Sequence, residues 1–206
     1  VIFDDETVRQ AARQEIVRRY YKAECDYKMG NCTKETVERI RLLMNENKLS
    51  VNDRAVVKPA LEKAETAGCA AVALELEGGV FVTGKSNKLM TACASAVLNA
   101  IKTLSRIADD MLLLSPIVLS PIIGLKKDVL REDKVKLSLG DVLTALSICA
   151  ATNPIAEKAM SMLVRLRDCE AHSSCILPEA DQSVMRKLGI RLTCEPEYGS
   201  KDLYGF

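Results

Sequence analysis

The chain has 206 residues, with 29 Lys and Arg against 28 Asp and Glu, so its formal net charge is +1. This balance excludes a general nucleic-acid binder, which needs a basic surface for phosphates, and a polybasic protein of the membrane surface. Hydrophobic residues make up 48% of the chain, enough to form one substantial domain or two small ones. We therefore expect folded domains whose partners are neither nucleic acid nor membrane.

Cysteine usage and the chain ends point to a compartment. The apolar stretch 111–125 is too short to span a bilayer and is broken by Pro116 and Pro121. The eight cysteines include no CxxC pair, and a chain with an ample core does not need disulfides. The N-terminus lacks a secretory signal, and the chain starts at Val1 rather than Met. We expect a cytoplasmic protein with reduced thiols, and a chain that is a fragment of a longer protein.

The first third of the chain is patterned for helices. Apolar residues recur at steps of three and four over residues 4–29, which predicts one long amphipathic helix. Thr33 is placed to cap a second helix, and Ser50 with Asp53 forms a capping pattern for a third stretch. The last helix of this part ends at Gly68. Residues 1–68 are therefore predicted to form a helical N-terminal arm or subdomain.

The pattern changes period after residue 68. Two strand-like runs, 70–77 and 80–83, are separated by Gly78-Gly79, which is typical of a tight β-hairpin. Because a hairpin is antiparallel, the sheet must be mixed or antiparallel. We predict an α+β fold (a mixed α/β sandwich) over residues 69–206, with a mixed sheet of four to five strands and flanking helices. The further expected elements are a helix over 87–106, a strand over 111–114, helix starts at Ser120, Ser138 and Asn153, a strand over 169–177, a helix over 179–188 and a strand over 190–195.

A phosphate-loop pattern follows the hairpin turn. The segment Gly79–Ser86 (GVFVTGKS) matches GxxxxGK[ST] letter for letter. A phosphate loop wraps its N–H groups around an anion and needs small interior residues, whereas residues 80–82 are stiff strand formers. Three interpretations stay open: a nucleotide loop, a simpler anion site at a strand-to-helix junction, and an ordinary helix cap with a solvated lysine. The anion site would use a helix start and a lysine, and comprises Thr83, Gly84, Lys85, Ser86 and Asn87.

The only histidine lies in a second pattern. Cys169, His172 and Cys175 have a C-x2-H-x2-C spacing that resembles a zinc site. Side chains alternate between faces on a strand, so His172 points away from both cysteines. We therefore expect neither a metal nor a cofactor. The remaining catalytic candidates are His172, Cys175 and Glu195, and for His172 a structural or interface role is favoured over that of a general base.

Several long strings carry a family resemblance. The runs 141–154 (DVLTALSICAATNP), 169–174 (CEAHSS) and 186–198 (RKLGIRLTCEPEY) resemble the C-terminal region of the bacterial uncharacterised protein family 0371, a domain of unknown function. Residues 13–20 and 82–86 resemble it as well, so the resemblance covers nearly the whole chain.

The resemblance implies a larger protein of two parts, with an N-terminal α/β domain absent here. Some proteins of this kind are called ATP-dependent peptidases, although no peptidase constellation is present in this sequence. The family offers no catalytic residues to carry across.

Three functions are compatible with these patterns. The first is a C-terminal domain of an uncharacterised bacterial protein that binds a small anionic or phosphorylated ligand and supports assembly. The second is part of an enzyme active site that the missing N-terminal domain completes. The third is an ATP-dependent hydrolase or peptidase. The helical arm, with its Tyr20-Tyr21 pair, also suits a homo-oligomer.

Overall fold

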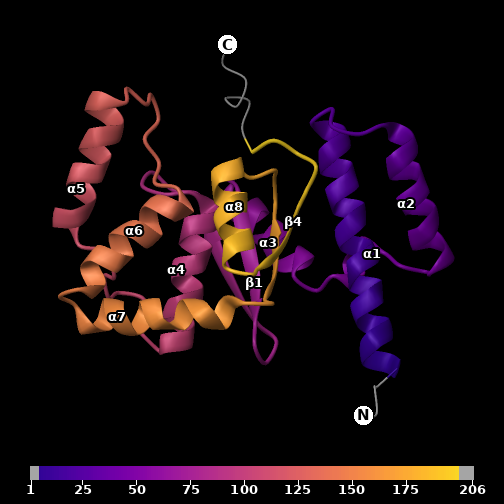
Figure 1. Ribbon diagram of the computed structural model, residues 1–206, viewed down its shortest axis with the longest axis horizontal. Helices are drawn as coiled ribbons and strands as arrows, with labels where there is room; N and C mark the ends of the chain where they lie inside the picture. Colours follow the sequence, from indigo (N-terminus) through magenta and orange to yellow (C-terminus); the bar gives the residue numbers. More distant parts are fainter. Residues whose placement is uncertain (1–4, 200–206) are drawn as a thin grey trace.

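The computed structural model describes residues 5–199. Helices at both ends of the molecule flank a small central sheet (Figure 1). The helices are α1 (Asp5–Lys28), α2 (Lys34–Glu46), α3 (Val57–Ala67), α4 (Ala92–Ser105), α5 (Pro116–Gly124), α6 (Leu139–Ala150), α7 (Pro154–Ser161) and α8 (Glu179–Lys187), with short turns η1 (Val51–Asp53), η2 (Leu125–Val129) and η3 (Met162–Leu166). The strands are β1 (Ala71–Leu76), β2 (Val80–Lys85), β3 (Glu170–Ser173) and β4 (Arg191–Cys194).

The four strands form one mixed sheet in the order β2-β1-β3-β4. β1 pairs antiparallel with both β2 and β3, whereas β3 and β4 are parallel because α8 lies between them in the chain. This arrangement confirms the predicted α+β fold. Both predicted strands of the hairpin are present as β1 and β2, and the turn between them contains Gly78 and Gly79 with φ angles of 84° and 74°. Residues with a side chain rarely adopt such positive φ angles, which explains why glycine occupies both positions.

The two faces of the sheet are covered by different helices. α4 packs on the face that carries Val72 and Leu74, and with them forms the main hydrophobic core. α3 packs on the opposite face, where Ala60 contacts Ala73. α4 approaches β2 so closely that a Cβ on Gly84 would lie 2.1 Å from the backbone nitrogen of Ala96. Only glycine permits this contact, so the helix and the strand are fixed to each other at Gly84.

The expected helix start at residue 87 is wrong, because α4 begins at Ala92. The Asn87 side chain accepts hydrogen bonds from the backbone N–H groups of Leu89 and Met90, at 2.8 and 2.9 Å, and so forms a turn before the helix. Thr91 then caps α4 by accepting from the N–H of Ala94. A six-residue loop therefore separates β2 from α4.

Other boundaries also differ from expectation. The predicted strand over 111–114 is wrong: these residues form turns, although Leu113 and Leu114 are buried. The helix expected from Ser120 starts earlier, at Pro116, and runs through Pro121. The strand expected over 169–177 is limited to β3. For the two expected strands, a short apolar run is partly buried without continuing a strand ladder.

Capping patterns were the more reliable signals. Ser138 and Asp141 form the expected capping box of α6, and the Asn153 side chain accepts from two backbone N–H groups at the start of α7. Ser50 and Asp53 form a capping box as well, although the helix that it begins is the short turn η1. α3 ends at Gly68 in a left-handed conformation, as predicted.

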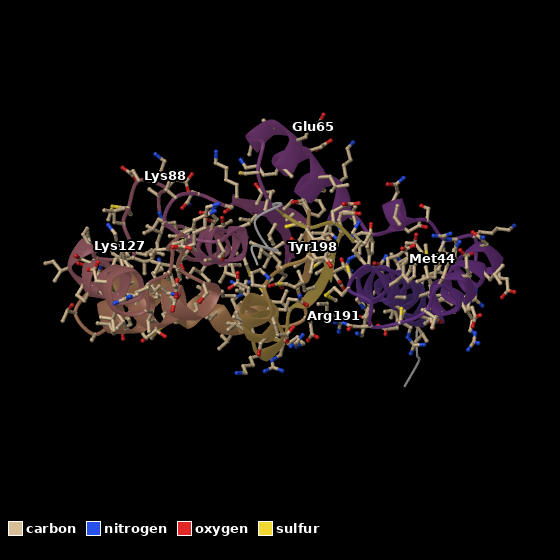
Figure 2. All side chains as sticks on the ribbon, turned by 90° about the horizontal axis from the view of Figure 1, so that it is seen from above. Met44, Glu65, Lys88, Lys127, Arg191 and Tyr198 are labelled. Carbon is tan, nitrogen blue, oxygen red and sulfur yellow. The ribbon has the colours of Figure 1, made fainter. Side chains whose placement is uncertain are left out.

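α1 and α2 form an antiparallel helical hairpin beside the edge strand β4 (Figure 1). A separate apolar cluster, which includes Val17, Tyr21 and Met44, joins the two helices. Figure 2 shows Met44 on α2 and Lys127 after α5 at opposite ends of the molecule, with Arg191 of β4 and Glu65 of α3 between them. The division at residue 68 stays a prediction. α3, on the N-terminal side of it, packs on the sheet.

Two further properties concern the whole of the described chain. Within residues 5–199, the helices are all too short or too polar to cross a membrane. All eight cysteines are free thiols, five of them buried. The cytoplasmic location stays a prediction.

Candidate functional site

The predicted anion site borders a cavity of about 530 Å³ between β2, α4 and the segment that leads into α5. Pockets that bind small ligands usually have a volume of roughly 300–1,000 Å³ and mostly apolar walls. The walls here follow that pattern, because eight of the seventeen lining residues are leucines or methionines, from the loop before α4, from α4, from residues 111–114 and from α5. The lining residues used below are Lys63, Lys85, Lys102, Asn87, Ser95, Asn99, Leu112 and Leu119.

Three lysines from three different elements stand around this cavity. Lys63 comes from α3, Lys85 from the end of β2 and Lys102 from α4. No aspartate or glutamate lines it, and within the described residues none of the three lysines forms an ion pair. The Lys102 Nζ donates to the backbone oxygen of Asp109 at 2.8 Å. The cavity therefore has a cationic rim without matching carboxylates.

Four of the five predicted anion-binding residues line this cavity. They are Thr83, Gly84, Lys85 and Asn87. Ser86 does not line the cavity, and its hydroxyl accepts a hydrogen bond from the Lys136 Nζ at 2.7 Å. Sequence reasoning missed Lys63 and Lys102, half-buried residues of two different helices whose positions in the sequence carry no signal of a shared site.

The backbone of this junction is not an open anion cradle. The N–H of Ser86 donates to the Ala70 oxygen at 2.8 Å, and the N–H groups of Leu89 and Met90 donate to the Asn87 side chain. The interior of the GxxxxGK[ST] pattern is the extended strand β2, which cannot wrap a phosphate. Its two glycines serve the hairpin turn and the contact with α4. An anion here would therefore be held by side chains rather than by free amides.

A second polar cluster surrounds His172, on the face of the sheet opposite α4. His172 is completely buried, and its Nε2 lies 3.1 Å from Glu195 Oε1 while its Nδ1 lies 2.7 Å from the Thr193 hydroxyl. The Tyr21 hydroxyl of α1 donates to the same Glu195 oxygen at 3.2 Å. The structure thus brings together two of the three catalytic candidates, His172 and Glu195.

Burial favours the neutral form of His172. Arg54 Nε donates to the Thr193 hydroxyl at 2.8 Å, and the hydroxyl hydrogen has two acceptors, His172 Nδ1 at 2.7 Å and the Ala171 oxygen at 3.3 Å. We assign the hydroxyl hydrogen to the shorter contact with Nδ1, and in this tautomer the Nε2–H donates to the Glu195 carboxylate. Burial lowers the pKa of His172, and the Glu195 carboxylate opposes that effect in part.

Arg54 is the centre of this cluster and is itself buried. Its guanidinium forms an ion pair with Glu170 and donates to the backbone oxygens of Ala171 and Arg191 at 2.8 and 2.7 Å. Arg18 of α1 pairs with the other Glu170 oxygen at 2.9 Å. Sequence reasoning missed Arg54, because an arginine next to a capped turn is ordinarily a surface residue.

Cys175 does not join this cluster. It is buried, its thiol contacts the hydroxyls of Ser173 and Ser174, and burial raises its pKa, which makes it a poor nucleophile. No group of three or more His, Cys, Asp or Glu side chains in residues 5–199 is arranged to hold a metal ion.

Comparison with known proteins places the chain in a family. Residues 52–204 match the model described as "Domain of unknown function DUF1846, C-terminal", and residues 1–48 match "Domain of unknown function DUF1846, N-terminal". The chain belongs to this family, UPF0371. A UPF0371 protein of Clostridium botulinum (strain Alaska E43 / Type E3) is 48% identical over 98% of this chain, and one of Clostridioides difficile (strain 630) is 49% identical over 98%. The chain spans only 42% of the length of either relative.

Proposed function

We propose that this part of the UPF0371 protein binds a small amphipathic anion, with a phosphate or carboxylate group on an apolar body, in the cavity between β2, α4 and α5. The observation that carries the proposal is the composition of the lining. Three lysines and no carboxylate surround walls that are otherwise mostly apolar.

The cationic rim favours an anionic group by simple electrostatics. Lys85 and Lys63 have no acidic partner within the described part of the chain, so an anion would meet charges that are not already neutralised. Asn99 and Asn87 are less available, because their amide groups donate to the Thr83 oxygen and to the Ser95 hydroxyl. The lysines are therefore the groups that would select the ligand's charge.

The apolar walls favour a ligand with a hydrophobic body. Leu112 is strongly exposed at the edge of the cavity, and Leu119 is buried at its wall. Covering such side chains is worth about 25 cal/mol per Å² of apolar surface. Inorganic phosphate alone would gain none of this free energy, so an apolar substituent should increase affinity.

Isothermal titration calorimetry with octyl phosphate and with inorganic phosphate tests the proposal. Octyl phosphate should bind at least about tenfold more tightly than phosphate, because only its chain covers the apolar walls. The Lys85→Gln substitution should weaken octyl phosphate binding about fivefold, the effect of about 1 kcal/mol from a partly solvated charge.

Lys158→Gln is the matched control. Lys158 is an exposed lysine of α7 that is not among the residues lining this cavity, so its loss should leave affinity unchanged. Equal binding by wild type and Lys85→Gln would contradict the assignment of the anionic group to this cavity. Equal affinities for phosphate and octyl phosphate would contradict the role of its apolar walls.

The His172 cluster supports a structural role better than a catalytic one. Both ring nitrogens are occupied by Thr193 and Glu195, and the ring has no exposed surface on which a substrate could approach. A general base must reach the proton that it removes. We therefore infer that His172 and Glu195 hold α1 against the sheet, and we assign no reaction to them.

A further inference from the structure

We propose that the first half of α1, together with the neighbouring ends of β3 and β4, is the docking surface for the rest of the amino-terminal domain of the full-length protein. Two independent observations lead to this proposal. The first is the boundary between the two family models. The second is the exposed first half of α1, which needs a covering surface to be a stable helix.

The family boundary separates the α1–α2 hairpin from the sheet. The N-terminal family model ends at residue 48 and the C-terminal model starts at residue 52, so both helices of the hairpin fall in the former. Two helices bury too little surface to form a domain alone. The chain spans 42% of the length of its relatives, and its residues 1–48 match the N-terminal family model. The remainder of the amino-terminal domain is therefore long enough to cover the α1–α2 hairpin.

The start of α1 is exposed on every side. Residues 6–12 are all exposed although they make almost two helical turns, and Val8 has 54% of its surface accessible. A short helical end that buries little surface is marginal in water. The second half of α1 differs, because Val17 and Tyr21 are buried against α2 and the sheet. The contacts of this helix in the present chain therefore account for only part of its length.

An open groove of about 530 Å³ runs beside the exposed turns. Gln10, Ala11 and Gln14 of α1 line one side, and Glu170 and Arg191, from the ends of β3 and β4, line the other. This side of the sheet ends in β4, whose outer edge would otherwise be open to another strand.

Ion pairs hold the second half of α1 against the sheet at one end of the groove. Arg18 of α1 and Arg54 both pair with Glu170, and Arg54 is only 1% exposed. Tyr21 adds a hydrogen bond to Glu195. A partner that docks in the groove would therefore meet a sheet side that is already fixed, and binding would have to order only the exposed first turns of α1.

Hydrogen–deuterium exchange on two lengths of chain tests the proposal. In the 206-residue chain the amides of residues 6–12 should exchange nearly as fast as in an unfolded peptide. In the full-length chain, which includes the complete amino-terminal domain, they should exchange at least about a hundredfold more slowly. The Ala11→Arg substitution in the full-length chain should remove this protection, because a long charged side chain fills the groove.

Val164→Arg is the matched control, since Val164 is 78% exposed in η3, and it should leave the protection of residues 6–12 unchanged. Equal exchange of residues 6–12 in the two chains would overturn the proposal. Protection that survives Ala11→Arg would overturn it too. Protection of these amides in the short chain that increases with protein concentration would show instead that a second copy of the chain covers the surface.

Discussion

At the scale of single residues, His172 illustrates how a buried polar side chain can be fully satisfied. Its two ring nitrogens, the Thr193 hydroxyl and the Glu195 carboxylate form one continuous chain of hydrogen bonds that starts at Arg54. Leaving any buried member without a partner would cost about 1–3 kcal/mol. The cluster joins α1 to the sheet through the Tyr21–Glu195 hydrogen bond, and burial favours the neutral form of His172 within it.

This neutrality predicts a pH dependence of stability. Burial lowers the pKa of His172 in the folded state below the value of about 6.5 expected in the unfolded chain. The unfolded state then binds more protons, so the free energy of unfolding should fall as the pH falls through about 6.5, by up to about 1.4 kcal/mol per unit. Urea unfolding of wild type and His172→Gln between pH 7.5 and 5.5 measures this contribution.

The variant separates His172 from other titrating groups. Burial raises the pKa of Asp181, which acts in the opposite direction and is present in both proteins. The slope for wild type should therefore exceed that for His172→Gln, whatever the absolute values. Identical slopes would mean that the pKa of His172 is not lowered by folding.

Individual site residues could be predicted only in part. The sequence singled out Lys85 and its neighbours because strand, glycine and lysine lie together, and His172 with Glu195 because both are chemically distinctive. Arg54 and Glu170 were missed, since their pairing depends on how the turn that contains Arg54 packs against β3 and β4. Sequence spacing carries no information about a contact between residues 116 positions apart.

At the scale of elements, the contact between β2 and α4 positions the cavity. Gly84 lets the strand lie directly on the helix, and the loop from Ser86 to Thr91 then turns around the cavity mouth. The same glycine completes the apparent phosphate-loop pattern, which shows how packing can imitate a nucleotide motif.

The Gly84→Ala substitution should therefore destabilise the fold. The added Cβ would lie 2.1 Å from the backbone of Ala96, so α4 must move, and overpacking of this kind costs about 1–3 kcal/mol or more. Gly140→Ala is a suitable control, because its Cβ would have no contact closer than 3.7 Å and helices favour alanine over glycine. Chemical denaturation of both variants measures the difference. A Gly84→Ala protein as stable as Gly140→Ala would contradict the close contact.

Elements with local signals were predicted well, and those set by tertiary contacts were not. The glycine pair and the caps at Ser138 and Asn153 depend on residues that are close together in the sequence. The periodicity over residues 4–29 predicted the helix α1 but not its buried face, because Val8 and Tyr27 are exposed whereas Val17 and Tyr21 are buried. The segment 111–114 instead looks like a strand because it is apolar, but only Leu113 and Leu114 are buried in the main core, and no strand pairs with them. An apolar run of this length does not by itself specify the backbone conformation.

At the scale of the whole molecule, the two proposed surfaces lie at opposite ends. The cavity belongs to the end that carries α5, whereas the exposed turns of α1 belong to the end with the helical hairpin (Figure 1). The sheet and α4 lie between them. A docked amino-terminal domain at α1 would therefore leave ligand access at the cavity unobstructed by the groove contacts.

Chemical-shift mapping of the 15N-labelled chain during titration with octyl phosphate tests the central claim, that an amphipathic anion occupies the cavity, most directly. If the anion occupies the cavity, the largest chemical-shift changes should fall on the amides of Lys85, Leu112 and Leu119. The amide shifts of Tyr21 and Thr193 should stay unchanged. Changes that are absent, or that centre on the His172 cluster or on α1, would contradict it.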